Sequence, residues 1–385
     1  MRSLELFTGC GGLALGMSAA GFQHEAVVEF DHDCCETLRL NRGRKIEHVQ
    51  DWPIVETDVR GFDFDSVTAD VVGGGVPCQP FSLGGKHLAE RDARDMFPAF
   101  AKAVERLRPK AFVVENVKGL LRSTFADYFE YVLLRLSHPA IPLRGTWREH
   151  RRDLERIHTS GRTTDLDYNV VFRLVNAADF GVPQRRERVF IVGFRSDIDA
   201  RWSFPAPTHS RLALYQDQWV TGEYWDRYRV PKAKRPTPPN VKEVPGIEEF
   251  TKPWRTVRDA IDGLPRLRPG QTSRLDPNHF LNPGARSYAG HTGSPLDEPA
   301  KTLKAGDHGV PGGENTLALP DGSVRYFSVR EAARLQTFPD SYWFAGSWTE
   351  RMRQVGNAVP VELARIMAAS IACRLTSSET VNPKH

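Results

Sequence analysis

One cysteine of this chain stands where its thiol suits nucleophilic chemistry. Cys78 follows an apolar pair, three glycines and Pro77, in the order Val71-Val72-Gly73-Gly74-Gly75-Val76-Pro77-Cys78. The pattern predicts a buried strand that opens into a glycine-rich loop, and a thiol at such a place is accessible to a substrate. Free cysteines are, however, among the most buried residues of proteins. Considered alone, Cys78 is therefore better explained as an inert thiol beside a turn.

An acid and two arginines adjoin other predicted strands. Glu115 directly follows the apolar run Ala111–Val114, and ligands of open α/β sheets bind at the carboxyl ends of strands. Arg186 and Arg188 lead into the apolar run Val189–Val192, with the spacing that places both on one face of a strand. Arginines that abut a buried strand need anionic partners. A solvent-exposed charge run, the alternative, fits the adjoining strand less well.

The N-terminal segment has the order strand, glycine loop and helix that is typical of nucleotide-binding α/β units. Leu4–Phe7 predicts the strand, Thr8-Gly9-Cys10-Gly11-Gly12 the loop, and Leu13–Ala20 the helix. Glycines let backbone amides at the start of the helix approach a ligand. The loop lacks a complete G-x-G-x-x-G pattern, so a tight turn without a ligand explains it equally well.

Two acids at the ends of the next strands continue this pattern. Glu29 lies about 20 residues after the loop, where dinucleotide-binding folds place the carboxylate that binds ribose hydroxyls. Phe30 beside it is positioned to stack on a base, and Asp58 ends a third predicted strand near the adenine part of a cofactor. A solvated acid is the alternative for Glu29, but the spacing favours the ligand.

These strand ends predict an α/β fold: a doubly wound, Rossmann-like domain over residues 1–199. Parallel strands present their carboxyl ends at one edge of the sheet. The residues expected at that edge are Gly9, Glu29, Asp58, Cys78 and Glu115.

The composition changes after Phe204, where prolines become dense and hydrophobic periodicity fades. This change predicts a second, loop-rich domain. Aromatic and basic residues interleave near residues 219–235, and residues 227–235 contain five basic side chains and no acid. This pattern favours a nucleic-acid-facing surface, with a flexible proline-rich insertion as the alternative.

The bulk composition narrows the class of protein. The chain has 385 residues, of which 40% are hydrophobic and 26% charged, with a net charge of +4. It can therefore bury a core, and its charge is compatible with a polyanionic partner. The five cysteines include no C-x-x-C pair, which predicts no metal site, no disulfide framework and a reducing compartment. We expect neither a membrane span nor a signal peptide.

Taken in order, the motifs resemble those of the DNA (cytosine-5) methyltransferase family of bacterial restriction–modification systems. The resemblance covers most of the chain. It rests on Phe7–Gly12, Glu29-Phe30, Gly75–Gln79, Glu115–Val117, Gln184–Arg188, Arg330–Pro339 and Gln354–Pro360. Arg94-Asp95-Met96-Phe97 is an imperfect version of the motif that follows the nucleophile loop, so Met96 and Phe97 are given no cofactor role.

The resemblance implies a catalytic set of four residues. Cys78 would be the thiolate that attacks cytosine C6, Glu115 the acid at ring N3, and Arg186 and Arg188 the residues that orient the base. The base that removes the C5 proton is left unassigned, with water as one candidate.

The resemblance also implies a cofactor and DNA contacts. The residues expected to bind S-adenosyl-L-methionine are Phe7, Thr8, Gly9, Cys10, Gly11, Gly12, Glu29, Phe30, Asp58, Val59, Pro77, Asn357 and Ala358. Those expected to contact double-stranded DNA are Gln79, Ser82, Lys86, Arg94, Thr302 and Leu303, the last two being similar to the Thr-Leu signature of the target-recognition domain. The resemblance implies that this smaller, loop- and β-rich domain spans residues 200–325. It also implies that residues 326–385 form a hinge and a C-terminal helix that returns to the first domain.

Three functions are compared. The first is a sequence-specific DNA methyltransferase, expected to be a monomer in the bacterial cytoplasm and at the nucleoid, with or without a partner endonuclease. The second is a tRNA-directed relative with the same core, but the long basic and aromatic segment and the absence of a Cys-Phe-Thr tripeptide favour DNA. The third is a non-catalytic binding protein, which would not need the thiol, the acid and the arginines.

Overall fold

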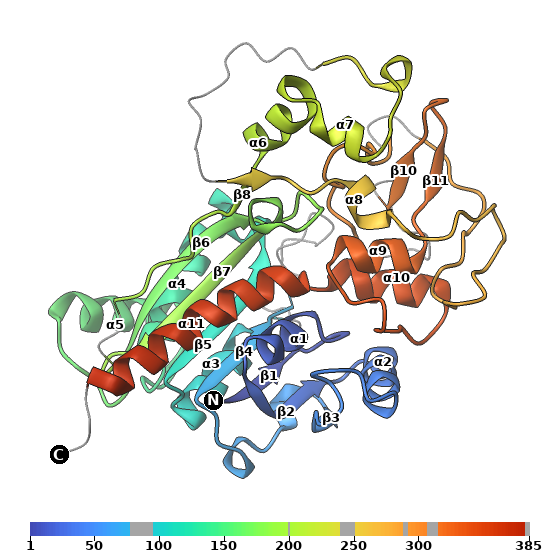
Figure 1. Ribbon diagram of the computed structural model, residues 1–385. Coiled ribbons are helices and arrows are strands. Elements are labelled where there is room, and N and C mark those ends of the chain that lie inside the picture. Colours follow the sequence, from blue (N-terminus) through green and yellow to red (C-terminus); the bar gives the residue numbers. More distant parts are fainter. Residues whose placement is uncertain (78–94, 199–200, 239–250, 288–291, 306–314, 382–385) are drawn as a thin grey trace. The chain divides into compact units, whose positions relative to one another are not determined.

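The computed structural model describes residues 1–77, 95–198, 201–238, 251–287, 292–305 and 315–381 (Figure 1). The chain divides into two compact units, each assembled from segments distant in sequence. Unit 1 comprises Met1–Val175, Glu187–Phe204 and Ser341–His385, and unit 2 comprises Asn176–Arg186 and Pro205–Asp340. Residues 176–186 and 326–340 thus pack with unit 2, outside the range of 200–325 predicted for the second domain.

Unit 1 is built around a seven-stranded sheet. Its strands are β1 (Arg2–Leu6), β2 (Gln23–Glu29), β3 (Ile54–Glu56), β4 (Val71–Gly75), β5 (Ala111–Val117), β6 (Tyr168–Asn176) and β7 (Glu187–Arg195). Its helices are α1 (Gly12–Ala19), α2 (His32–Gly43), α3 (Phe97–Leu107), α4 (Ala126–Ser137), α5 (Trp147–Ser160), α10 (Trp348–Asn357) and α11 (Val361–Val381). Short 3₁₀ turns are η1 (Val59–Gly61), η2 (Phe64–Ser66), η3 (Lys118–Leu121) and η4 (Ser123–Phe125).

The strand order is β3-β2-β1-β4-β5-β7-β6. Every neighbouring pair among β1 to β5 is parallel, whereas β7 pairs with β5 in the antiparallel sense. The carboxyl ends of the five parallel strands therefore meet at one edge, as the sequence predicted. The loops after β1, β2, β4 and β5 all leave the sheet there.

Two successive glycines of β4 show that helices pack on both faces of the sheet. A Cβ atom built on Gly74 would lie 3.2 Å from Phe100 in α3, whereas one built on Gly73 would lie 2.8 Å from the sulfur of Met17 in α1. The absence of side chains in the strand lets both helices approach closely. Helices α1 and α11 also lie against each other, with Ala364 filling the space beside Gly16. The doubly wound arrangement is thus confirmed.

The sheet contains a buried acid next to Gly73. Glu5 in β1 is fully buried, and within the described part of the chain neither carboxyl oxygen has a hydrogen-bond partner. Burial raises the pKa of Glu5 well above 4.5 because the charged form is poorly solvated. The folded protein therefore keeps a proton on Glu5 that the unfolded chain releases at lower pH.

Glu5→Gln is expected to flatten the pH dependence of stability. Above about pH 4.5 the unfolded state binds fewer protons at this position than the folded state, so the wild type loses stability as pH rises towards the raised folded pKa. An amide does not titrate and removes this loss. Thermal unfolding midpoints of both proteins, measured from about pH 5 to about pH 9, should diverge with rising pH. Parallel curves would show that Glu5 is ionised in the folded protein.

Unit 2 consists of short elements. They are η5 (Ala177–Phe180), β8 (His209–Ser210), α6 (Arg211–Tyr215), a π-helical turn η6 (Gln216–Val220), α7 (Glu223–Arg227), η7 (Lys232–Lys234), β9 (Lys252–Pro253), α8 (Val257–Ile261), β10 (Thr316–Ala318), β11 (Val324–Tyr326) and α9 (Val329–Leu335). β8 pairs with β9 and β10 with β11, so this unit contains two small two-stranded sheets in its described parts.

The aromatic residues near α7 form a small core. Tyr224 and Trp225 are each 1% exposed, and Trp219 packs against the Trp225 ring with 5.1 Å between centroids. The prediction that aromatic rings interleave with cations on the surface is therefore wrong for Tyr224 and Trp225. Burying large rings is the main apolar gain open to a unit with so few regular elements. The exposed cations of this segment include Arg229, Lys232 and Lys234.

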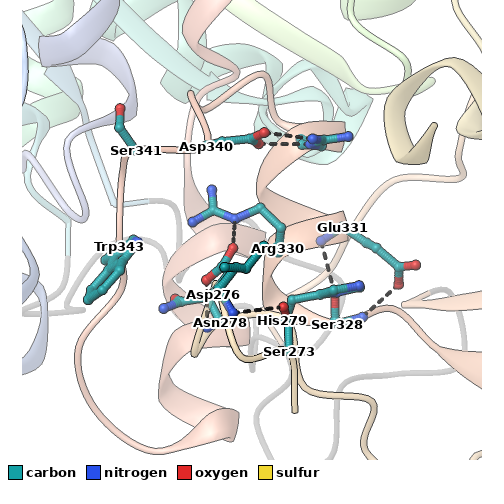
Figure 2. A network of polar contacts seen from close by, with 12 residues as sticks. Ser273, Asp276, Asn278, His279, Ser328, Arg330, Glu331, Asp340, Ser341 and Trp343 are labelled. Carbon is teal, nitrogen blue, oxygen red and sulfur yellow. Dashed lines mark hydrogen bonds and ion pairs between the residues drawn. The ribbon is translucent and has the colours of Figure 1, made fainter. Parts of the chain in front are cut away.

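A polar network ties an irregular segment of unit 2 to the start of α9 (Figure 2). Arg330 is fully buried and pairs with Asp276. A ring nitrogen of His279 lies 2.8 Å from the hydroxyl of Ser328, which caps α9 by accepting the backbone N–H of Glu331. A buried arginine needs such a carboxylate partner. The network therefore fixes the path of a segment that has no regular secondary structure.

Candidate active site

Two charged side chains at the edge of the sheet form an ion pair. Nε of Arg188 in β7 lies 2.8 Å from Oε1 of Glu115 in β5. Glu115 is 6% exposed, and the side chain of Arg188 is 12% exposed. With so little water nearby, the guanidinium group orients the carboxylate. Of the predicted catalytic set, these two residues are brought together.

The strand that leads to Cys78 ends beside this pair. Gly75, the last residue of β4, is in register with Glu115, and a Cβ atom built on Gly75 would lie 3.7 Å from Oε2 of Glu115. The side-chain amide of Asn116 donates to the carbonyl oxygen of Val76 at 3.3 Å. β5 therefore holds both the acid and the first residue of the loop.

Five of the predicted site residues lie outside the described part of the chain. Pro77 is half-buried and is the last described residue before the gap. The five residues are Cys78, Gln79, Ser82, Lys86 and Arg94.

Arg186 does not share a strand face with Arg188. β7 begins at Glu187, and Arg186 belongs to unit 2, where it is fully buried and donates to the carbonyl oxygen of Leu303 at 2.9 Å. The prediction based on two-residue alternation is wrong because the strand starts between the two arginines. Within unit 2, Arg186 links its own segment to Leu303.

Glu29 connects the glycine loop after β1 to the turn after β2. One carboxylate oxygen accepts the backbone N–H of Gly9 at 2.7 Å, and the other accepts those of Phe30 and Asp31 at 2.9 and 2.8 Å. Burial raises the pKa of Glu29, while the three N–H groups oppose the rise. A carboxylate has about four acceptor sites, and the site left on Oε2 can accept a hydroxyl group of a ligand.

The surroundings of Glu29 offer space and an aromatic surface. Gly9 has φ +56°, and a Cβ atom built there would have nothing within 4 Å. Phe30 is 67% exposed, so the face of its ring is open to a ligand. Phe7 also has a left-handed φ of 56°, and Thr8 is buried with its hydroxyl 3.2 Å from the Val28 carbonyl oxygen. An open glycine, a carboxylate and an exposed ring suit a nucleoside.

The second half of the glycine loop packs against the C-terminal segment. The carbonyl oxygen of Cys10 accepts the hydroxyl of Tyr342 at 2.8 Å, and its thiol donates to the carbonyl oxygen of Gln354 at 3.4 Å. Burial raises the pKa of the Cys10 thiol to about 12, so this thiol is structural. Gly11 has φ +87°, and its Cβ position lies 3.0 Å from the Tyr342 hydroxyl oxygen. A Cβ on Gly12 would lie 2.3 Å from the Val359 carbonyl oxygen.

The remaining predicted cofactor residues occupy two turns of unit 1. Asn357, exposed, ends α10, and the N–H of Ala358 donates to Gln354 at 3.1 Å. Asp58 forms an ion pair with Arg60 at 2.5 Å and also caps η1. Both contacts lower the pKa of the Asp58 carboxyl group. Val59 is buried. The Asp58 carboxylate would therefore have to contact an adenine while it remains paired with Arg60.

The predicted Thr-Leu signature lies inside unit 2. The hydroxyl of Thr302 donates to the carbonyl oxygen of Arg185 at 2.7 Å, and the N–H of Leu303 donates to the side chain of Gln184 at 2.9 Å. Leu303 is 1% exposed. A DNA contact by the Leu303 side chain does not fit this position, whereas its backbone helps to order the segment.

The sequence predicted neither a metal site nor a membrane span. Among the described residues, no group of three or more metal-ligating side chains is found. None of their helices is long and apolar enough to span a bilayer.

Comparison with known proteins decides the family. Residues 1–138 and 148–373 match the C-5 cytosine-specific DNA methylase family. The chain belongs to this family. Its chemistry is the transfer of a methyl group from S-adenosyl-L-methionine to C5 of cytosine in DNA.

Curated relatives and solved structures agree with this assignment. The chain is 33% identical over 377 residues to the type II methyltransferase M.Eco47II of Escherichia coli. The matched region covers 96% of this chain and 78% of the relative. It is 32% identical over 375 residues to M.AplI of Arthrospira platensis, with 97% and 86% covered. The S. pombe Dnmt2 methyltransferase shares the fold, with a TM-score of 0.57, 18% identity and 98% of each chain covered.

Several residues that shape this methyltransferase site were missed in the sequence. Tyr342 holds the Cys10 carbonyl group and Asn116 holds Val76. Asp31 donates to Glu29 and in turn pairs with Arg353. Asn116 lies within the Glu115–Val117 motif and Asp31 directly follows Glu29-Phe30, so their position was the only available signal. Tyr342 lies outside every motif, and its role depends on packing across the whole chain.

Gly12→Ala is expected to destabilise the methyltransferase by about 1–3 kcal/mol and to weaken cofactor binding. The new methyl group would meet the Val359 carbonyl oxygen, which is backbone and cannot rotate away. Thermal unfolding and titration with S-adenosylhomocysteine measure the two effects. Gly43→Ala is the control because nothing lies within 4 Å of that position. Equal behaviour of the two variants would mean that α1 tolerates a shift away from Val359.

Proposed function

We propose that this methyltransferase modifies a cytosine within a specific sequence of double-stranded DNA, through a covalent adduct between Cys78 and C6 of a flipped-out base. The observation that carries this proposal is the Glu115–Arg188 pair at the end of β5, directly beside the strand that leads to Cys78. An acid paired with a cation, beside a strand whose next residues lead to a cysteine, suits nucleophilic attack on a ring.

The proposed chemistry begins at the thiolate of Cys78, which forms a bond to C6 of the cytosine. The electron pair of the C5–C6 double bond moves towards C5, while Glu115 holds the proton at ring N3 and relieves the charge that develops there. Arg188 keeps the Glu115 carboxyl group oriented. S-adenosylmethionine, when bound, would supply the methyl group to C5; its S–CH3 bond would break, and S-adenosylhomocysteine would leave with the electron pair of that bond. Loss of the C5 proton to a base then restores the double bond and releases the Cys78 thiolate.

The cofactor fits the residues around Glu29. The carboxylate of Glu29 would accept the ribose hydroxyls, and the exposed ring of Phe30 would stack on the adenine. Backbone at Gly9 would approach the cofactor in the space that a Cβ atom would otherwise fill. Asn357, Ala358 and Pro77 are proposed to line the same site.

Unit 2 is proposed to recognise the DNA. The exposed cations Arg229, Lys232 and Lys234 suit contacts with phosphates, which position a protein without reading sequence. Flipping the target base out of the duplex costs a few kcal/mol.

Further DNA contacts are proposed for Thr302 of unit 2 and for four residues outside it. The four are Gln79, Ser82, Lys86 and Arg94.

The biological setting proposed is a bacterial restriction–modification system. The curated relatives bear the names of type II methyltransferases from bacteria, which supports protection of DNA against an endonuclease of the same specificity. The methyltransferase would then act as a monomer on DNA in the cytoplasm.

Bisulfite sequencing tests the proposal. DNA from cells that express the protein should show methylated cytosines at one recurring sequence, and none in cells that carry Cys78→Ser. Methylation spread over unrelated sequences would contradict sequence specificity, and methylated tRNA with unmodified DNA would contradict the substrate. DNA that carries the modification should also resist a restriction enzyme of matching specificity.

A further inference from the structure

An arginine in α10 reaches the turn that holds Glu29. Nη2 of Arg353 lies 2.9 Å from Oδ2 of Asp31, and its Nε donates to Glu350 at 2.6 Å. The side chains of Arg353 and Asp31 are 29% and 27% exposed, so water screens the pair only in part. Both residues belong to unit 1, and neither is among the cofactor residues proposed above.

Asp31 connects this ion pair to Glu29. Its Oδ1 accepts the backbone N–H of Cys34 at 2.9 Å and so caps α2, while its Oδ2 receives Arg353. Its own N–H donates to Oε1 of Glu29 at 2.8 Å. One residue thus contacts α10, the start of α2 and the carboxylate proposed to bind ribose.

The next residue of α10 fixes the helix in the same region. The side-chain oxygen of Gln354 accepts the hydroxyl of Thr37 in α2 at 2.6 Å, and its nitrogen donates to the carbonyl oxygen of Asp33 at 3.3 Å. Gln354 is 1% exposed. Because α10 is held rigidly against α2, Arg353 can act as a fixed point for Asp31.

Charge gives Arg353 a second effect on this turn. Burial raises the pKa of Glu29, and the neighbouring charge of Asp31 adds to the rise. Although partial burial opposes it, the pKa of Asp31 is lowered by the N–H of Cys34 and by Arg353. The positive charge of Arg353 therefore offsets the negative charge of Asp31, which lies two residues after Glu29.

We propose that Arg353 is a positioning residue for cofactor binding, which holds Asp31 so that the Glu29 carboxylate stays in the orientation that receives the ribose hydroxyls. This inference rests on the proposed role of Glu29. Because Arg353 contacts no reacting atom, its removal raises the KM for S-adenosylmethionine and leaves kcat within about twofold.

The test compares two ligands in Arg353→Met. Calorimetric titration is done with S-adenosylhomocysteine and with an analogue that lacks the ribose 2′-hydroxyl. We expect the variant to bind the complete ligand about fivefold more weakly, as for a partly exposed charge pair. We expect a smaller loss for the analogue, because part of the interaction that depends on Glu29 is already missing.

The matched control is Arg365→Met. Arg365 in α11 forms a two-pronged pair with Glu362, three residues earlier, at 2.8 and 2.7 Å. Arg353 also pairs with a glutamate three residues earlier, Glu350, through its Nε, but in addition it reaches Asp31. Arg365→Met should therefore leave the affinity for both ligands unchanged.

Two further variants test the route through Asp31. Arg353→Lys keeps the charge and should restore part of the affinity. Asp31→Asn removes the charge but keeps a side chain that caps helices well. Combining Arg353→Met with Asp31→Asn should lower the ligand affinity little more than either change alone. Additive losses of affinity would show that the two residues act independently and would overturn the inference.

The outcomes separate this inference from the proposed function. An equal loss of affinity for both ligands in Arg353→Met would indicate general damage to the fold and would overturn the inference. If Glu29→Gln weakens binding but Arg353→Met does not, only the inference fails. If Glu29→Gln itself leaves binding unchanged, the proposed ribose site fails.

Discussion

Cys78→Ser is expected to slow methyl transfer by at least about a thousandfold while DNA binding persists. A serine hydroxyl is not ionised near neutral pH and attacks a ring carbon far more weakly than a thiolate. The cofactor contacts around Glu29 and the cations of unit 2 are untouched by the change. Incorporation of labelled methyl groups measures the rate, and an electrophoretic mobility shift measures DNA binding.

Cys373→Ser is the control for this variant, because Cys373 is exposed on α11 and has no proposed part in the reaction. A direct trap strengthens the test. DNA that contains 5-fluorocytosine should form an adduct with the wild type that survives denaturing electrophoresis, because fluorine at C5 cannot leave as a proton. Full activity of Cys78→Ser, or no adduct with active enzyme, would remove the thiolate mechanism.

Glu115→Gln is expected to lower kcat roughly a hundredfold. Glutamine has the same shape and keeps a polar oxygen beside Arg188, but it cannot exchange a proton with ring N3. Cofactor affinity should stay near the wild-type value because the described contacts of Glu29 do not include Glu115. Single-turnover kinetics with saturating DNA isolate the chemical step.

Glu187→Gln is the matched control for Glu115→Gln. Glu187 lies next to Arg188 in the sequence but pairs with Lys118 at 2.8 Å, and its side chain is 47% exposed. Its loss should change the rate little. If both variants are equally slow, the effect of Glu115 is a general effect of charge near β7, and its role at N3 is excluded.

The sequence predicted the strand ends well because parallel strands carry strong local signals. Gly9, Glu29 and Glu115 each follow a short apolar run, and β1 to β5 are parallel neighbours. Once the strands are identified, geometry brings their carboxyl ends to one edge. The acid of this methyltransferase could therefore be placed without knowledge of its partners.

Features that depend on long-range packing could not be predicted in this way. Arg186 carries the same alternation signal as Arg188, yet the strand begins between them and Arg186 is buried in unit 2. Tyr224 and Trp225 resemble surface aromatics among cations, but they are buried with Leu214 in a small apolar cluster. Arg353 is one of many helix arginines, and only the fold brings it to Asp31.

The contact between Cys10 and Gln354 joins residues 344 positions apart. During translation the glycine loop and α1 leave the ribosome long before the C-terminal segment that packs against them, with Val359 at Gly12 and Ala364 of α11 at Gly16. Contacts of such sequence separation form late in folding. We therefore expect a nascent or prematurely terminated chain to lack a formed cofactor loop. Modification of the genome would then begin only with finished polypeptides, and truncated products would be inert.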